Sequence, residues 1–387
     1  MPTPQPISRL AEFGTTIFAE MSARASATGA INLGQGFPDT DGPAEVMEAA
    51  IGAIREGRNQ YPPGDGLPEL RTAIAEHQRR FWNLDFDPEG EVLVTVGATE
   101  AIAASVLGLT EPGDTVVTFE PYYDSYAATI ALAGARRRPI TLRPPDFAVD
   151  LDDLAAAMAD RPRLILLNSP HNPTGKVFTR DELRTVAELC DRYDVIAVTD
   201  EVYEHIAFDG PHIPLATLPG MADRTVTISS AGKTFSFTGW KIGWACARAP
   251  LIGAVRSVKQ FLTYAHAPAF QVGVTVGLGL PDDVYTSLAA ELQAKRDRLV
   301  VGLRSAGFEV FPPAGTYFAL TDVRPLGFHD GLELCRALPE EAGVAAVPVS
   351  VFYDDKEVGG PLVRFAFCKQ DDVLDEAVDR LMAWRGR

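Results

Sequence analysis

The sequence predicts an α/β protein in which a large domain with a mostly parallel, seven-stranded sheet is joined to a smaller α+β domain. In the middle of the chain, short β-rich runs alternate with helical stretches, and such alternation is typical of parallel sheets with right-handed crossovers. Several of these runs are apolar throughout, as expected of strands that are covered on both faces. The last third departs from this alternation, which indicates a second unit of different topology.

The predicted elements of the large domain alternate along the chain. Its strands are predicted at residues 91–96, 115–119, 139–142, 164–167, 195–199, 225–228 and 242–245. Helical patterns lie between them at residues 100–109, 125–133, 151–159 and 180–194. In the smaller domain a long helix comes first, short strands follow and a helix closes the chain, at residues 284–306, 309–310, 316–320, 344–349, 363–367 and 372–384.

The chain of 387 residues is long enough for two or three domains. Its N-terminal segment, residues 1–43, has no obvious sheet of its own, so we expect this segment to pack on the smaller domain or on a partner subunit. The large domain then covers residues 44–282, and the small C-terminal α+β domain covers residues 283–387.

The composition argues against several classes of protein. A net charge of −17 argues against a nucleic-acid partner, because phosphate binding needs a basic surface. The four cysteines are widely spaced and form no CxxC motif, which favours a reducing compartment. We find neither a signal peptide nor an apolar run of membrane-spanning length, so we expect a cytoplasmic protein with no membrane partner.

Common nucleotide, metal and hydrolase motifs are missing or incomplete. Gly34-Gln35-Gly36 resembles the start of a dinucleotide fingerprint, but Asp39 stands where the third glycine belongs. Thr174-Gly175-Lys176 ends like a P-loop, but Pro170 replaces its first glycine. No HExxH or GxSxG motif occurs, and the six histidines do not group with Cys or acidic residues at metal-ligand spacing. We therefore predict no metal site.

One lysine is notable in a chain that contains only seven. Lys233 follows the apolar run 226–228 and lies among the small residues Ser230, Ala231 and Gly232. A lysine that binds an aldehyde cofactor as a Schiff base needs such a place, because burial lowers its pKa and small neighbours leave room. The alternative is a solvated lysine in a glycine-containing turn, and this segment alone does not decide between the two.

Two candidate ligand groups follow the first two strands. Ala98 and Thr99 lie where the strand 91–96 turns into a helix, and the exposed amides there could hold a phosphate. An ordinary βα turn explains the same pattern. Tyr123 follows the second strand and could stack on a planar ring, although aromatic residues at such positions more often serve packing.

Two later strands end in further polar groups. Asn172 lies in a turn with two asparagines and two prolines in eight residues, which is either an Asx-turn loop or a rigid turn that aims an amide at a phenolic oxygen. Asp200 follows the strand 195–199, where an acid can keep a pyridine nitrogen protonated, and Tyr203 could face the same site. Five segments with such residues follow successive strands, and their combination favours a cofactor site over a chance occurrence of ordinary turns.

These segments resemble class I, fold-type I pyridoxal-phosphate aminotransferases, and the resemblance extends along essentially the whole chain. It implies the aspartate-aminotransferase-like fold. The branch it resembles combines kynurenine, glutamine and methionine aminotransferases with actinobacterial N-succinyldiaminopimelate aminotransferases, and residues 98–102 and 238–241 are most similar to the latter. The family-like segments are residues 33–39, 59–62, 169–175, 200–203, 230–235 and 363–365.

The resemblance implies how pyridoxal 5'-phosphate would bind. Lys233 would be the Schiff-base lysine, which also moves the proton between the substrate Cα and the cofactor. Asp200 would pair with the pyridine nitrogen, Asn172 and Tyr203 would bond the phenolic oxygen, and Tyr123 would stack on the ring.

The resemblance also implies a phosphate site shared between two subunits. The backbone of Ala98 and Thr99 would bind the phosphate together with the side chains of Ser230 and Lys241. Tyr61 would reach the phosphate of the other subunit, so the active unit would be a homodimer with shared active sites.

Further residues would bind the substrate. Arg364 would clamp the α-carboxylate with its bidentate fork, close to Gly36 and Asn172. Phe18 stands where the kynurenine branch has a tryptophan, which puts a preference for aromatic substrates in doubt. The stretch 261–270 differs in length from that branch, and we expect Tyr264 there to contribute to the partner's substrate pocket.

The implied function is that of an aminotransferase that moves an amino group between an amino acid and a 2-oxoacid, with glutamate and 2-oxoglutarate as the shared pair. For the specific substrate we favour N-succinyl-LL-2,6-diaminopimelate, in lysine biosynthesis. The alternative is glutamine, methionine or kynurenine transamination, with a side β-lyase activity on cysteine conjugates. More remote alternatives are a lyase or synthase on the same fold and a non-catalytic PLP-binding regulator.

Overall fold

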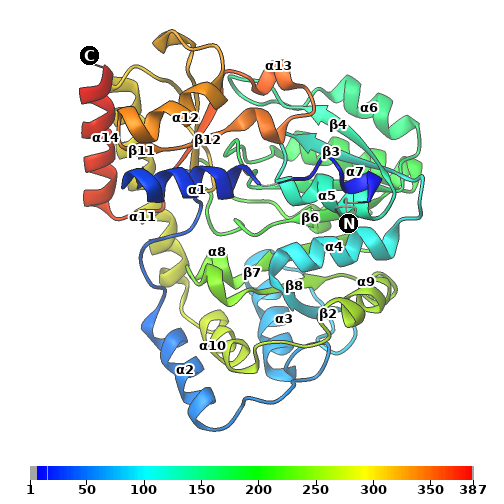
Figure 1. The fold of residues 1–387 in the computed structure, drawn as a ribbon. Coiled ribbons are helices and arrows are strands. Elements are labelled where there is room, and N and C mark those ends of the chain that lie inside the picture. The colour runs from blue at the N-terminus through cyan, green and yellow to red at the C-terminus, as the bar shows by residue number, and fades with distance from the viewer. Residues whose placement is uncertain (1–6, 15, 386–387) are drawn as a thin grey trace, which may run out of the picture.

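The computed structural model describes residues 7–14 and 16–385, and Figure 1 shows its fold. Residues 1–6 and 15 of the predicted N-terminal segment lie outside the described residues, as do residues 386–387 of the predicted C-terminal domain. The described part of the chain contains a seven-stranded, a four-stranded and a two-stranded sheet, with helices packed around them.

The seven-stranded sheet has the strand order β2-β8-β7-β6-β5-β3-β4. Its members are β2 (Val92–Val96), β3 (Thr115–Glu120), β4 (Arg136–Thr141), β5 (Leu164–Asn168), β6 (Ile196–Asp200), β7 (Thr225–Ser230) and β8 (Ile242–Cys246). Strand β8 runs antiparallel to both of its neighbours, β2 and β7. The other pairings are parallel, which confirms the predicted α/β class with a mostly parallel sheet.

Helices cover both faces of this sheet. Successive residues of a strand point to opposite faces, so neighbouring residues contribute to different cores. Val117 and Ile165 face a core that includes residues of α6 (Leu151–Ala159) and α7 (Arg180–Tyr193). Val116 and Leu164, their neighbours in sequence, face a second core with α4 (Gly97–Leu109), α5 (Asp124–Leu132) and α9 (Ala249–Leu262). Burial on both faces explains why these strands are apolar throughout.

A third core lies at the β2 end of the sheet, at the bottom of Figure 1. It joins α2 (Ala44–Arg55), α3 (Pro68–Trp82) and α10 (Pro268–Leu278) to β2 and β8. The sequence patterns did not predict these helices or α9. Helix α10 was missed because it contains glycines, which disfavour helices. A β-carbon at Gly273 would lie 2.7 Å from the Val46 carbonyl oxygen, so the close packing of α10 on α2 requires glycine there.

The C-terminal part of the chain begins with α11 (Asp282–Ser305) and forms the antiparallel sheet β12-β13-β10-β9. The N-terminal segment packs on this part: α1 (Ile17–Thr28) lies against α12, and β1 (Ile31–Asn32) pairs in parallel with β11. The remaining strands and long helices are β9 (Glu309–Phe311), β10 (Phe318–Asp322), β11 (Val344–Ala345), β12 (Val347–Pro348), β13 (Leu362–Ala366), α12 (Gly331–Glu341) and α14 (Asp371–Arg385).

Short helices complete the fold. They are α8 (Ala231–Thr234), α13 (Lys356–Gly359) and the 3-10 helices Ser8–Leu10, Leu215–Thr217, Thr238–Trp240, Arg324–Leu326 and Val349–Phe352. The domain boundaries after residues 43 and 282 stay a prediction. Within residues 7–14 and 16–385, no helix is both long and apolar enough to cross a membrane.

Two predicted elements need correction. The single strand predicted at residues 344–349 is two short strands in different sheets, because β11 pairs with β1 of the N-terminal segment whereas β12 pairs with β13. The helix predicted at residues 100–109 begins three residues earlier, at Gly97. Ala98 and Thr99 therefore lie within its first turn, where backbone amides are not used by the helix itself.

Candidate active site

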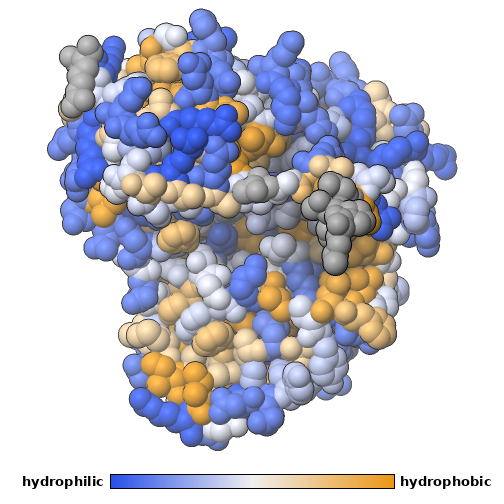
Figure 2. Space-filling model, in the orientation of Figure 1, coloured by the Kyte–Doolittle hydropathy of each residue, from blue (hydrophilic) through white to orange (hydrophobic). Residues whose placement is uncertain are grey.

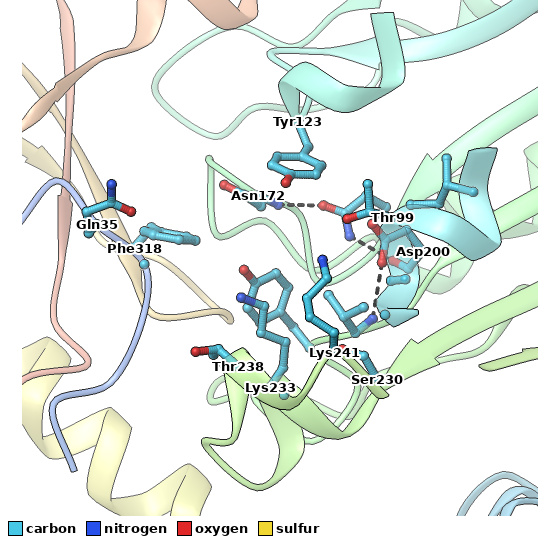
Figure 3. A pocket seen from close by; sticks show the side chains of 18 of the residues that line it. Gln35, Thr99, Tyr123, Asn172, Asp200, Ser230, Lys233, Thr238, Lys241 and Phe318 are labelled. Atoms are coloured by element: carbon cyan, nitrogen blue, oxygen red, sulfur yellow. Dashed lines mark hydrogen bonds between the residues drawn. The ribbon is translucent and has the colours of Figure 1, made fainter. Parts of the chain in front are cut away.

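The carboxyl ends of β2, β5, β6 and β7 meet at one edge of the seven-stranded sheet, because these strands run in the same direction. Strand β8 runs the opposite way and brings its amino end to the same edge. A cavity of about 300 Å³ lies there, and Figure 3 shows residues that line it. The predicted site residues in its lining are Phe18, Gly36, Ala98, Thr99, Tyr123, Asn172, Asp200, Tyr203, Ser230, Lys233, Lys241 and Arg364.

Lys233 lies in α8, directly after β7, and its side chain points into the cavity (Figure 3). Its Nζ donates to the Tyr317 hydroxyl at 2.7 Å, and that hydroxyl donates to the Gly36 carbonyl oxygen at 2.7 Å. Burial lowers the pKa of Lys233 to about 8, so a substantial fraction of this amine is uncharged at neutral to slightly alkaline pH. An uncharged amine can act as a nucleophile or as a base.

Asp200 is the last residue of the interior strand β6 and is only 5% exposed. Its carboxylate accepts a hydrogen bond from the Tyr126 hydroxyl and a long one, 3.4 Å, from the Val202 amide. It forms no ion pair with any described residue. Burial raises the pKa of Asp200 to about 6, because the charged form loses water without gaining a cation.

The first turn of α4 and nearby side chains form a cradle whose donors could hold an anion. No side chain caps this helix end, so the amides of Ala98 and Thr99 stay available at the positive end of the helix dipole. Gly97 has a φ of +66°, and a β-carbon there would lie 3.4 Å from Lys241 Nζ and narrow the cradle. Ser230, at the end of β7, lines the same cavity.

Arg364 lies on β13 and is 2% exposed. Its guanidinium donates to Asn172 Oδ1 at 3.1 Å and to the Gly34 carbonyl oxygen at 2.8 Å, while its Nε has no partner among the described residues. The guanidinium carbon lies 3.9 Å from the ring centre of Phe318 and 5.1 Å from that of Phe18. Burial lowers the pKa of Arg364 to about 10, so the group stays charged at neutral pH and is available to a carboxylate.

Two predicted residues do not line this cavity. Tyr61 is 83% exposed and Tyr264 is 53% exposed, and their ring centres lie 6.0 Å apart in an edge-to-face pair. Phe261, at the end of α9, is 84% exposed. Such a group of exposed aromatic residues is typical of a surface that binds another protein chain.

Several residues that line the cavity, or that bond to its lining, were not predicted. Tyr126 lies one helical turn after Tyr123, so the spacing could have placed both on the cavity side of α5. Asn168 ends β5 and donates to the Asp200 carbonyl oxygen at 2.7 Å, a position that the strand-end argument could have reached. Tyr317 and Phe318 come from the distant C-terminal part, and no local motif distinguishes them. The unpredicted lining residues also include Gln35, Gly97, Ile102, Val202, Gly232, Thr238 and Ile242.

An amine of lowered pKa between anion-binding groups, in a cavity of this size, indicates an enzyme that acts on small charged molecules. The chain belongs to the aminotransferase class I and II family, whose model matches residues 28–381. It is therefore an aminotransferase, and the predicted family and enzyme class are confirmed.

Two relatives illustrate how specific the similarity is. The chain is 53% identical over 386 residues to the probable N-succinyldiaminopimelate aminotransferase DapC of Mycobacterium tuberculosis, and the match covers 97% of each chain. It is 40% identical over 377 residues to the methionine aminotransferase of Escherichia coli, again with 97% of each chain covered.

Solved structures agree with this similarity. N-succinyldiaminopimelate aminotransferase from Mycobacterium tuberculosis matches with a TM-score of 0.96 and 54% identity, over 98% of this chain and 99% of that chain. A single mutant of Thermus thermophilus aspartate aminotransferase matches with a TM-score of 0.90 and 30% identity, over 99% of this chain and 100% of that chain. The predicted aspartate-aminotransferase-like fold is confirmed.

Proposed function

We propose that this aminotransferase uses pyridoxal 5'-phosphate to transfer an amino group between N-succinyl-LL-2,6-diaminopimelate and 2-oxoglutarate, a step of lysine biosynthesis. The observation that supports the chemistry is the presence of Lys233, Asp200 and Arg364 in one cavity. The choice of substrate rests on similarity, because identity is 53% to the DapC relative and 40% to the methionine aminotransferase.

The phosphate of the cofactor fits the cradle at the first turn of α4. Ala98 and Thr99 would bind it through their amides, and Ser230 and Lys241 through their side chains. This donor set supplies hydrogen bonds and one positive charge to a dianion at the positive end of a helix, which is a favourable arrangement.

The ring of the cofactor fits between Asp200 and Tyr123. Asp200 is a buried carboxylate without a cationic partner among the described residues, and a protonated pyridine nitrogen would supply the missing charge. Tyr123 lies on the opposite side of the cavity from Lys233 in Figure 3, where its ring could stack. Asn172 and Tyr203 line the space between them and would bond the phenolic oxygen.

The chain's own groups would then act on the amino acid. When bound, pyridoxal 5'-phosphate supplies an electron sink that stabilises negative charge at the substrate Cα. Arg364 would bind the α-carboxylate and so fix which Cα bond faces the lysine. Lys233 is an amine of lowered pKa. It would take the proton from the substrate Cα and deliver it to the cofactor carbon that carried the aldehyde.

A homodimer is part of this proposal. The monomer leaves three large aromatic residues exposed, Tyr61, Phe261 and Tyr264. Beside them, Lys259 on α9 donates hydrogen bonds to the carbonyl oxygens of Gly64 and Tyr264. Apolar side chains also gather at the lower right of Figure 2, where Figure 1 draws α9. A second subunit on this surface would bury these residues and bring its Tyr61 to the phosphate cradle.

One observation favours a second candidate, methionine transamination. Among the described residues that line the cavity, the cations are Lys233, Lys241 and Arg364, and each already has a proposed partner. The remaining lining near Arg364 is apolar, with Phe18 and Phe318. An unbranched thioether side chain suits such a surface, whereas a succinylated side chain needs a further cation from the partner subunit.

The experiment that tests this function is a comparison of kcat/KM for transamination with 2-oxoglutarate. The donors are N-succinyldiaminopimelate, methionine, glutamine and kynurenine. We expect the succinylated donor to exceed the others by at least about tenfold, equivalent to about 1.4 kcal/mol. A higher value for methionine would replace the proposed substrate. The Lys233→Ala variant should lose catalytic turnover while keeping the fold, and substantial remaining steady-state transamination would contradict the role proposed for Lys233.

A further inference from the structure

A second group of polar side chains is buried outside the cavity, between α3 and the segment that follows β6. His77 lies on α3, and Glu204 and His205 lie four and five residues after Asp200. One potential ligand atom of each lies within 4.8 Å of the others. Because His77 is 128 residues away from His205, which directly follows Glu204, no spacing motif could have predicted this group.

The two histidines face each other. Their Nε2 atoms lie 2.8 Å apart, and only one of them can donate in that contact. His77 is 2% exposed, and its Nδ1 has no partner among the described residues. A neutral imidazole nitrogen can bind a metal ion.

Glu204 contributes a carboxyl group to this cluster. It is 2% exposed and accepts hydrogen bonds from Trp82 Nε1 and the Ser229 hydroxyl, but it forms no ion pair with any described residue. The nearby Glu201 differs, because His212 Nε2 lies 2.7 Å from its carboxylate. A buried carboxylate without a cation is costly, and each of its oxygens has two lone pairs, so it can accept these bonds and still bind a metal ion.

We propose that His77, Glu204 and His205 bind a divalent cation of the zinc type. Two imidazoles and one carboxylate form a known zinc donor set with an open fourth position. Zn–N distances of about 2.0–2.1 Å in a tetrahedron place the two nitrogens about 3.3 Å apart, so the histidines need to separate by about half an ångström. His205 is half-buried, whereas His77 and Glu204 are buried.

The cation would hold the segment between β6 and Ile206 against α3. That segment contains Tyr203, and Asp200 immediately precedes it, so the metal would fix the backbone that places both residues in the cavity. The role is structural, because the metal would not contact the substrate or the cofactor.

The test uses holoenzyme without a histidine tag, stripped with a chelator, incubated with a small excess of zinc chloride and desalted. Mass spectrometry of the metal should find about one zinc ion per chain, as expected for a single site. The variants His77→Gln and His205→Gln should lose this zinc. His329→Gln, which changes an exposed histidine, should retain it.

A second measurement covers the case in which a buried substitution prevents folding. X-ray absorption at the zinc edge of the unaltered holoenzyme should show two imidazole ligands together with oxygen ligands. Absence of retained zinc in the unaltered enzyme would overturn the proposal and leave a hydrogen-bonded histidine pair. Zinc retained in both variants at the level of the unaltered enzyme, or a ligand shell without two imidazoles, would also overturn it.

Discussion

At the scale of single residues, the cavity contains two buried charges that the described protein leaves without an ion pair. Asp200 at the end of β6 and Arg364 on β13 have opposite signs, yet each bonds to neutral groups instead. Burial of a charge without a partner costs stability, so such an arrangement is expected where ligands supply the missing charges. The two charges therefore favour a ligand that brings a cation to Asp200 and an anion to Arg364.

The substitution Arg364→Lys tests the anion site. Lysine keeps the positive charge but loses the planar fork that can bind both carboxylate oxygens. We expect kcat/KM for amino donors to fall about 30-fold, which corresponds to about 2 kcal/mol. Steady-state kinetics with two different donors is the measurement. An unchanged kcat/KM would mean that another group binds the α-carboxylate.

The substitution Asp200→Asn tests the other charge through the pH dependence of stability. The pKa of Asp200 rises on folding from its usual 3.8 to about 6, so the folded state binds more protons than the unfolded state between these values. The free energy of unfolding therefore decreases as pH rises from about 4 to 6, and the loss is complete above about 6.

Removal of this charge should reverse that loss. We expect cofactor-free Asp200→Asn to exceed the unaltered protein in unfolding free energy by up to about 3 kcal/mol near pH 8, and to gain nothing near pH 4. Urea unfolding at the two pH values provides the measurement. Equal stability near pH 8 would show that another cation already compensates Asp200.

Residues at strand ends could be predicted from sequence, whereas residues that act across the fold could not. Asp200 ends β6, and Asn172 lies four residues after the end of β5. Ligands of α/β sheets bind at the carboxyl ends of the strands, and this rule was enough to select both residues. Tyr317, whose hydroxyl accepts a hydrogen bond from Lys233, lies 84 residues further along the chain. It directly precedes β10 of the four-stranded sheet. Its position depends on how the C-terminal part packs against the large sheet, and no local pattern contains that information.

At the scale of elements, the first turn of α4 is where we propose that the phosphate binds. The substitution Gly97→Ala tests this, because Gly97 has a φ of +66° and the added β-carbon would approach Lys241. Gly113→Ala is the matched control: its φ is +94°, but no atom lies within 4 Å of the added carbon.

Both glycine variants should lose about 1–2 kcal/mol of unfolding free energy from backbone strain. Only Gly97→Ala should also bind pyridoxal 5'-phosphate more weakly, by about tenfold, when measured by fluorescence titration. Equal cofactor affinity in the two variants would contradict the placement of the phosphate at this helix end.

The ranges of strands buried on both faces were predicted well, whereas the range of an edge strand was not. Strand β5 is apolar because helices cover both of its faces, and its predicted range agrees with the structure to within one residue. The predicted strand at 139–142 begins earlier, at Arg136, because β4 is an edge strand whose first residues are partly exposed arginines. Polar residues on an edge hide a strand from a search for apolar runs.

At the scale of the whole molecule, the exposed aromatic group at the end of α9 predicts a homodimer. The substitution Phe261→Asp would place a carboxylate in that interface at a cost of about 2 kcal/mol or more, so the dimer dissociation constant should rise at least about 30-fold. Val301→Asp on α11 is the control, because Val301 is also exposed, at 64%, but lies on a different element. Sedimentation velocity distinguishes the two. A monomeric unaltered enzyme would remove the basis for a shared active site.

The overall architecture was accessible from sequence because one physical rule, strand–helix alternation with apolar strands, governs the large sheet. The C-terminal part follows no such rule: β1 and β11 have two residues each, and their pairing joins segments more than 300 residues apart. The position of such a pair depends on how the rest of the molecule packs, and no local pattern contains that information.

The measurement that tests the central claim most directly is an absorption titration of the purified, cofactor-loaded enzyme with single amino donors. The proposed function predicts that N-succinyldiaminopimelate converts the bound cofactor from its aldehyde form to its amine form at lower concentrations than methionine, glutamine or kynurenine. If N-succinyldiaminopimelate leaves the spectrum unchanged while another donor converts it, the enzyme remains an aminotransferase but the proposed substrate is wrong.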